Sequence, residues 1–163
     1  GLKADGNAPV HGIAGVEPAT LYRVDRMRVG TPPILALAAL DAALDAWDEV
    51  DMADVRKKSV ALCELFITQV EARCPELTLG SPRDGTKRGS QVSFLHDEGY
   101  AIMQALIARG VIGDFRAPNA IRFGFTPLYT SYEDVWRAVG ILEDILRTGA
   151  WQEPRFAVRA AVT

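Results

Sequence analysis

The sequence predicts an α+β domain in which a small, mainly antiparallel sheet is covered by helices. From residue 51 onward, stretches with a helical period alternate with pairs of short stretches that have the two-residue period of a strand. The order is helix, two strands, helix, two strands and helix, which is typical of a small sheet under helices. The 163 residues suffice for one domain with an approach segment but not for two full cores. We therefore divide the chain into residues 1–30, 31–50 and 51–163.

Residues 1–30 are interpreted as an extended approach segment with one short strand, because glycines and prolines interrupt any period. A helix is predicted next. Thr31 is a good N-cap residue, and Pro32 and Pro33 fit the first turn, where their missing N–H groups cost nothing. Every residue from Pro32 to Leu40 is apolar. We expect this helix to be covered on all sides, because it has no face for solvent.

A second helix is predicted from Asp51 to Arg73, with Asp51 as its N-cap and Pro75 as its stop. Its apolar positions recur every three or four residues, with Ser59 filling one turn; they are Val55, Leu62, Phe66 and Val70. The basic residues 56–58 lie off this line, so we interpret them as a solvated face.

The remaining strands and helices follow in order. Strands are predicted near residues 77–79, 91–96, 111–116 and 120–125, and helices after Asp97 up to Gly110 and from Ser131 to Gly149. Ser131 and Asp134 resemble a capping box. The loop at 81–90 is expected to be too charged for burial. The tail from Trp151 shows no period.

Charge and hydropathy exclude several classes of partner. The formal net charge of -3 gives no global basic field that would attract nucleic acid or an anionic membrane. The longest uncharged apolar run, from Pro32 to Leu40, is far shorter than the roughly 20 residues that a membrane span needs. The N-terminus is polar and Gly-rich, without the apolar core of a signal peptide, so we expect a cytoplasmic protein.

The cysteines and histidines predict neither a disulfide nor a metal site. Cys63 and Cys74 fall in one helical stretch, where their spacing separates them by roughly 16 Å. The two histidines, His11 and His96, have no zinc-ligand spacing to each other or to the cysteines. We expect the two thiols to be buried and inert.

Two features suggest ligand binding, although no complete catalytic motif is present. In AIRFGF, Ile121, Phe123 and Phe125 share the core face, which leaves Arg122 on the other face beside small neighbours. An arginine held on a strand suits bidentate binding of a carboxylate or phosphate; a solvent-facing arginine is the alternative. Thr31, at a helix start, is suited to contact an anion; a simple N-cap is the alternative.

Two stretches resemble the C-terminal part of kynureninase, a pyridoxal-phosphate enzyme of tryptophan catabolism. The first is GTPPILALAALDAALD; the second runs from RGSQVSF through GYAIMQALIARGVIGDFRAPNAIRFGFTPLY to EDIL. The resemblance covers roughly residues 28–148. It implies the small C-terminal domain of a fold type I enzyme, in a homodimer, with residues 31–50 as the linking helix toward the large domain and dimer interface.

The resemblance also implies roles for individual residues. Arg122 matches the arginine that binds the substrate α-carboxylate, Thr31 matches the residue that contacts the cofactor phosphate across the dimer interface, and Gly30 lies near the substrate. The Schiff-base lysine and most other cofactor ligands are expected upstream of position 1, so no catalytic residue is assigned in this chain. It is expected to be inactive alone and not to bind pyridoxal 5'-phosphate stably.

The implied reaction of the whole enzyme is hydrolysis of L-kynurenine to anthranilate and L-alanine. The 3-hydroxy form of kynurenine is the alternative substrate and would give the hydroxylated anthranilate. Two alternatives remain at this point. One is another fold type I lyase or transferase, such as a cysteine-desulfurase-like enzyme, which requires a cysteine on a mobile loop. The other is a non-catalytic α+β module that binds a small anion or mediates dimerisation.

Overall fold

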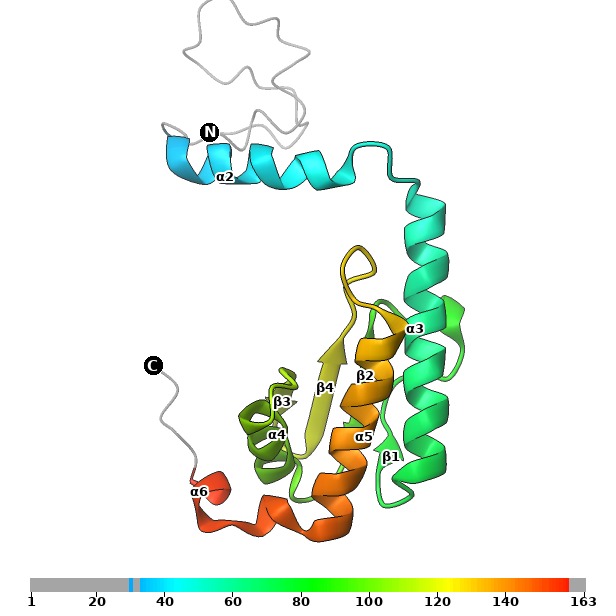
Figure 1. Ribbon diagram of the computed structural model, residues 1–163, viewed down its shortest axis with the longest axis vertical. Coiled ribbons are helices and arrows are strands. Elements are labelled where there is room, and N and C mark those ends of the chain that lie inside the picture. Colours follow the sequence, from blue (N-terminus) through cyan, green and yellow to red (C-terminus); the bar gives the residue numbers. More distant parts are fainter. Residues whose placement is uncertain (1–29, 31–32, 159–163) are drawn as a thin grey trace, which may run out of the picture. The chain divides into compact units, whose positions relative to one another are not determined.

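The computed structural model describes residue 30 and residues 33–158 (Figure 1). The chain divides into two units, residues 1–49 and 50–163, which are described separately. The first unit contains helix α2, Ile34–Leu44, followed by the 3-10 turn Asp45–Trp47. The second unit contains the sheet and the remaining helices.

Helix α2 begins later than the sequence predicted. Pro33, with extended backbone at φ -69° and ψ 100°, precedes its first residue, so the prediction of Thr31 as the N-cap is wrong. A residue that precedes proline is disfavoured in helical backbone, so a Pro-Pro pair delays the start of the helix. No residue of α2 is buried. The apolar composition predicted that α2 would be covered on all sides, but the described residues do not cover it.

Four antiparallel strands form the sheet of the second unit, in the order β1-β2-β4-β3. They are β1, Thr78–Leu79; β2, Gln91–Leu95; β3, Asp114–Arg116; and β4, Ala120–Gly124. The sequence predicted all four with slightly longer bounds, most of all for β3, and the α+β fold class is confirmed. Alternation places Val92, Phe94, Ile121 and Phe123 on one buried face of the sheet.

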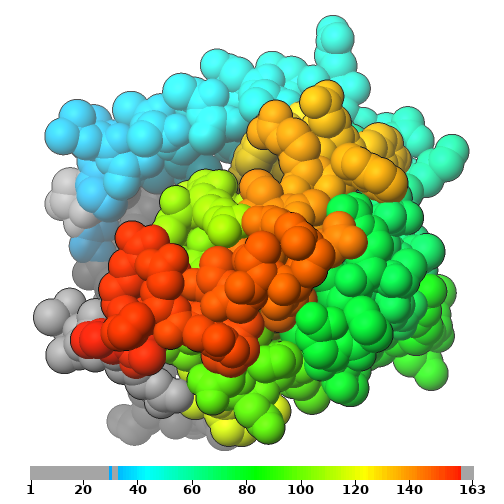
Figure 2. Space-filling view, turned by 60° about the horizontal axis from the view of Figure 1, so that its bottom comes forward, coloured from blue at the N-terminus to red at the C-terminus, as the bar shows by residue number. Residues whose placement is uncertain are grey.

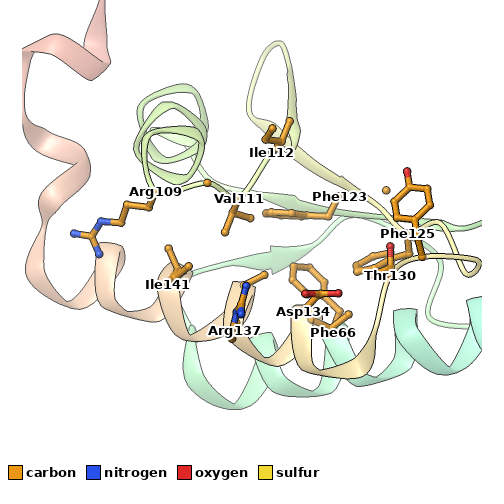
Figure 3. Close-up of a pocket in the computed structure, with 15 residues that line it drawn as sticks. Phe66, Arg109, Val111, Ile112, Phe123, Phe125, Thr130, Asp134, Arg137 and Ile141 are labelled. Atoms are coloured by element: carbon orange, nitrogen blue, oxygen red, sulfur yellow. The ribbon is translucent and has the colours of Figure 1, made fainter.

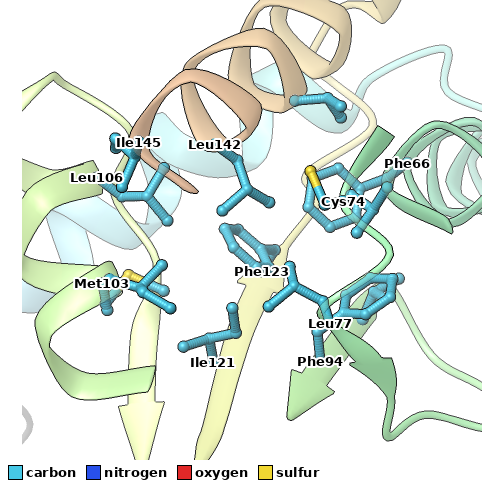
Figure 4. Close-up of a cluster of buried hydrophobic side chains, with 14 of the residues drawn as sticks. Phe66, Cys74, Leu77, Phe94, Met103, Leu106, Ile121, Phe123, Leu142 and Ile145 are labelled. Atoms are coloured by element: carbon cyan, nitrogen blue, oxygen red, sulfur yellow. The ribbon is translucent and has the colours of Figure 1, made fainter. Parts of the chain in front are cut away.

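Three helices cover that buried face: α3, Met52–Arg73; α4, Gly99–Ala108; and α5, Tyr132–Thr148. Their apolar sides and the inward strand residues form one core (Figure 4). Phe66 of α3 lies at its centre, with its ring centroid 4.7 Å from that of Phe123 and 6.0 Å from that of Phe94. The opposite face of the sheet carries the exposed and half-buried residues of the same strands.

The helix ends follow the sequence signals in α3 and α5. The Asp51 side chain accepts a hydrogen bond from the Ala53 N–H at the start of α3. Ser131 and Asp134 form the predicted capping box of α5, which ends at Gly149 in left-handed backbone.

Helix α4 begins after Glu98, not after Asp97 as predicted, because His96 closes the preceding turn. The His96 carbonyl accepts from the Gly99 N–H, and its Nδ1 accepts from the Glu98 N–H.

The 81–90 loop is mostly exposed, as its charge predicted, but Arg88 is an exception. Arg88 is buried and donates to the Glu64 carboxylate at 2.5 Å and to the Pro82 carbonyl at 2.6 Å. Arg56 donates to the carbonyls of Gly85 and Arg88. The basic residues 56–58 are therefore not simply solvated, because Arg56 holds this loop against α3.

After α5 the chain continues into the 3-10 turn Ala150–Gln152 and the short helix α6, Pro154–Ala157. The tail that lacked a period in the sequence thus has local structure, and its Phe156 is buried in the core. Figure 2 shows α5, in orange, beside the green surface of α3, and α6, in red, on the other side of α5, where it packs against α4.

Candidate functional site

Arg122 lies in the middle of β4, on the open face of the sheet. Its neighbours along the strand, Ile121 and Phe123, point into the core and are buried. The Arg122 side chain is 27% exposed. The backbone that carries it is fixed, because β4 is paired with β2 on one side and β3 on the other. The predicted separation of Arg122 from the core is therefore confirmed.

Asp114 is the immediate partner of Arg122. The two residues are directly opposite each other in the β3–β4 register, and Nη2 of Arg122 donates to Oδ2 of Asp114. This hydrogen bond holds the pKa of the Asp114 carboxyl below its usual range. Slight desolvation acts in the opposite direction, and the charges of Arg122 and Arg116 lower the pKa further. Arg116 Nε lies 3.6 Å from the same oxygen. One carboxylate thus faces two guanidinium groups.

Space remains beside the guanidinium. Arg122 Nε is itself buried and has no hydrogen-bond partner among the described residues. Ser93 of β2 is the cross-strand neighbour of Arg122 on its other side. A Cβ added at Gly124, two residues along the same face, would meet no atom within 4 Å. This part of the sheet surface can therefore accommodate a small anionic ligand beside Arg122.

The other two predicted site residues belong to the first unit. Gly30 is exposed, and a Cβ added there would also meet no atom within 4 Å. Thr31 lies outside the described residues. Of the three predicted site residues, the structure therefore describes the site surroundings of Arg122.

A pocket of about 380 Å³ opens on the helix side of the sheet (Figure 3). Its lining includes the apolar residues Phe66, Phe123 and Ile141 and the polar residues Arg137 and Thr130. Because Phe123 alternates with Arg122 on β4, this pocket and the guanidinium lie on opposite faces of the sheet. The pocket is not part of the Arg122 site.

Sequence reasoning placed residue 114 in a strand but missed its role beside Arg122. The reason lies in the length of the turn. Residues 117–119 connect the two strands, so Arg116 pairs with Ala120 and, two residues further along each strand, Asp114 lies opposite Arg122. A two-residue turn at Pro118 and Asn119 would have placed Phe115 there instead.

Neither cysteine is suited to nucleophilic chemistry. Cys63 and Cys74 are both free and buried. Burial raises the pKa of the Cys74 thiol to about 12, and burial also raises the pKa of the Cys63 thiol. Among the residues that the structure describes, no group of three or more His, Cys, Asp or Glu side chains is placed to hold a metal ion. No helix within the described ranges is long and apolar enough to cross a membrane.

Comparison with known proteins identifies the family. The sequence profile of the kynureninase C-terminal domain matches residues 55–142, a stretch that includes Arg122 and Asp114. The chain belongs to the kynureninase C-terminal domain family. The resemblance noted in the sequence is therefore confirmed for the α+β domain.

Individual kynureninases are similar over a longer stretch of the chain than residues 28–148. The chain is 54% identical to a kynureninase of Pseudomonas fluorescens over 142 residues, which is 86% of the chain and 34% of that relative. It is 53% identical to kynureninases of Burkholderia mallei strain SAVP1 and Burkholderia pseudomallei strain K96243, with the same coverage. The chain thus spans about one third of the length of the curated kynureninases that it matches.

Proposed function

We propose that this chain is the C-terminal part of a pyridoxal-phosphate-dependent kynureninase. The whole enzyme hydrolyses the Cβ–Cγ bond of L-kynurenine, or of 3-hydroxykynurenine, to give the anthranilate product and L-alanine. The observation that carries the proposal is Arg122, which lies within the family match and presents its guanidinium on the open face of the sheet. The same proposal includes a cytoplasmic homodimer and residues 31–50 as the link to a large domain.

Arg122 binds the substrate α-carboxylate in this mechanism. Its planar N–H donors match the two oxygens of a carboxylate, and its strand is rigidly paired on both sides. Fixing the amino-acid end of the substrate orients the bond that is broken. This contribution to catalysis is one of position.

The described residues fit the substrate end of such a site. Arg122 Nε has no partner among them. Lys58 Nζ, by contrast, donates to the Pro127 carbonyl at 2.6 Å. Pyridoxal phosphate, when bound, supplies the electron sink for cleavage of the carbon–carbon bond. We assign the phosphate contact to Thr31, a place near the substrate to Gly30, and the lysine to the upstream part of the enzyme.

The test uses the full-length protein with its cofactor. L-kynurenine should be converted to anthranilate, which is measured by its fluorescence, and Arg122→Ala should remove most of this activity while the cofactor absorbance is retained. A protein that shows no cofactor absorbance and no turnover would instead support the non-catalytic anion-binding or dimerisation module.

A cysteine-desulfurase-like activity is not favoured for this chain. Such an enzyme requires a reactive cysteine on a mobile loop, whereas Cys63 lies in α3 and Cys74 directly follows that helix, both fully buried.

A further inference from the structure

We propose that Asp114 is a positioning residue for substrate binding, which holds the Arg122 guanidinium in the orientation that receives the substrate α-carboxylate. This inference rests on the proposed role of Arg122. It extends that role to a residue on the neighbouring strand that does not itself contact substrate.

The strand register makes the pair a fixed one. Asp114 and Arg122 are cross-strand partners, so their backbones are held together by the β3–β4 ladder. The Arg122 side chain has several rotatable bonds and no other hydrogen bond among the described residues. The bond from Nη2 to Asp114 therefore selects one of many side-chain orientations before the substrate arrives.

The charges leave room for a second anion. The Asp114 oxygen that accepts from Arg122 also lies 3.6 Å from Arg116 Nε. Two guanidinium groups and one carboxylate give this cluster a net charge of about +1. An incoming carboxylate is therefore attracted, and Asp114 occupies only one nitrogen of the Arg122 fork.

A purely structural role predicts different behaviour. The Asp114 side chain is 50% exposed, and an ion pair at such a position contributes little to folding stability. Asp114→Asn should therefore leave the melting temperature nearly unchanged, while it weakens the hold on the guanidinium by removing the charge of the acceptor. The matched control is Glu153→Gln, which removes another ion-paired carboxylate whose side chain is also 50% exposed.

The experiment compares Asp114→Asn, Asp114→Glu and Glu153→Gln in the full-length enzyme with cofactor. We expect Asp114→Asn to raise KM for L-kynurenine about fivefold to thirtyfold, with kcat changed less than about threefold. The inhibition constant of the kynurenine analogue that lacks the α-carboxylate should be the same for wild type and Asp114→Asn. Asp114→Glu should recover part of the loss, and Glu153→Gln should match wild type.

Three results would overturn the inference. An unchanged KM would show that Asp114 does not position Arg122, and a lowered KM would show that Asp114 competes with the substrate. Equal losses for kynurenine and this analogue would show a structural effect. Arg122→Ala, measured in the same assays, separates this inference from the proposed function: if that variant retains wild-type KM and kcat, the role of Arg122 itself is wrong.

Discussion

Glu64 of α3 and Arg88 of the loop before β2 form an ion pair in which the arginine side chain is only 2% exposed. The same guanidinium donates to the carbonyls of Pro82 and Arg83. Ser90, at the end of this loop, lies 2.6 Å from the buried Ser59 hydroxyl of α3 and accepts from the Phe125 N–H. Arg88 thus links the loop to the helix that supports the sheet.

Replacing Arg88 with Met should destabilise the domain by about 2–4 kcal/mol, because the carbonyls of Pro82 and Arg83 lose their donor and Glu64 loses its buried partner. Urea denaturation of the full-length enzyme, followed in the transition of this domain, measures the loss. The control is Arg83→Met. Arg83 pairs with the same carboxylate but its side chain is 52% exposed, so this change should cost less than about 1 kcal/mol. Equal effects of the two variants would contradict the role assigned to burial.

Arg122→Ala should lower kcat/KM for L-kynurenine by roughly 30-fold to several thousandfold, since loss of a hydrogen-bonded charge partner typically costs about 2–5 kcal/mol. Arg122→Lys keeps the charge but loses the planar fork, so it should also be impaired. The melting temperature and cofactor absorbance should barely change. An analogue without the α-carboxylate should be bound equally by wild type and Arg122→Ala; a loss as large as that on kynurenine would make Arg122 structural.

Thr31→Ala in the full-length enzyme should weaken cofactor binding roughly tenfold to a hundredfold, if Thr31 donates its hydroxyl to the phosphate. Titration of the apoenzyme with pyridoxal phosphate, followed by absorbance, gives the dissociation constant. Thr31→Ser keeps the hydroxyl and should bind the cofactor nearly as wild type does. Unchanged affinity in a folded Thr31→Ala enzyme would remove the phosphate contact from the proposal.

Alkaline pH should destabilise the domain through Cys74. The thiol has an ordinary pKa of about 8.5 when unfolded, whereas burial raises its pKa to about 12 in the native domain. Between these values the unfolded state loses a proton that the native state keeps, so stability falls as pH rises, by at most about 1.4 kcal/mol per pH unit. Urea denaturation of the full-length enzyme at pH 8 and pH 10, followed in the transition of this domain, should show a steeper loss for wild type than for Cys74→Ala. Identical slopes would contradict this assignment.

Local signals predicted most of the fold. The alternation of apolar and polar residues identified β2 and β4, because apolar residues such as Val92 and Phe123 lie on the buried face of the sheet. The capping box at Ser131 fixed the start of α5, because its hydrogen bonds join residues only three apart.

Pairings distant in sequence were harder to predict. Arg88 and Glu64 are 24 residues apart, and the charge of the loop alone indicated exposure. The Arg122 face was predictable from alternation, but its Asp114 partner required the hairpin register as well. The late start of α2 was missed because Thr31 has the side chain of an N-cap, whereas the two prolines after it constrain the backbone more strongly.

The alternation along β2 and β4 makes these two strands suitable for protein engineering. Substitutions at positions 93 and 124 would alter the surface around Arg122, where a side chain at 124 has open space. The neighbouring Ile121 and Phe123 keep the core intact on the other face. A library confined to these two positions can therefore search for altered substrate preference at little cost to folding, whereas the same diversity at 121 or 123 would mostly yield unfolded protein.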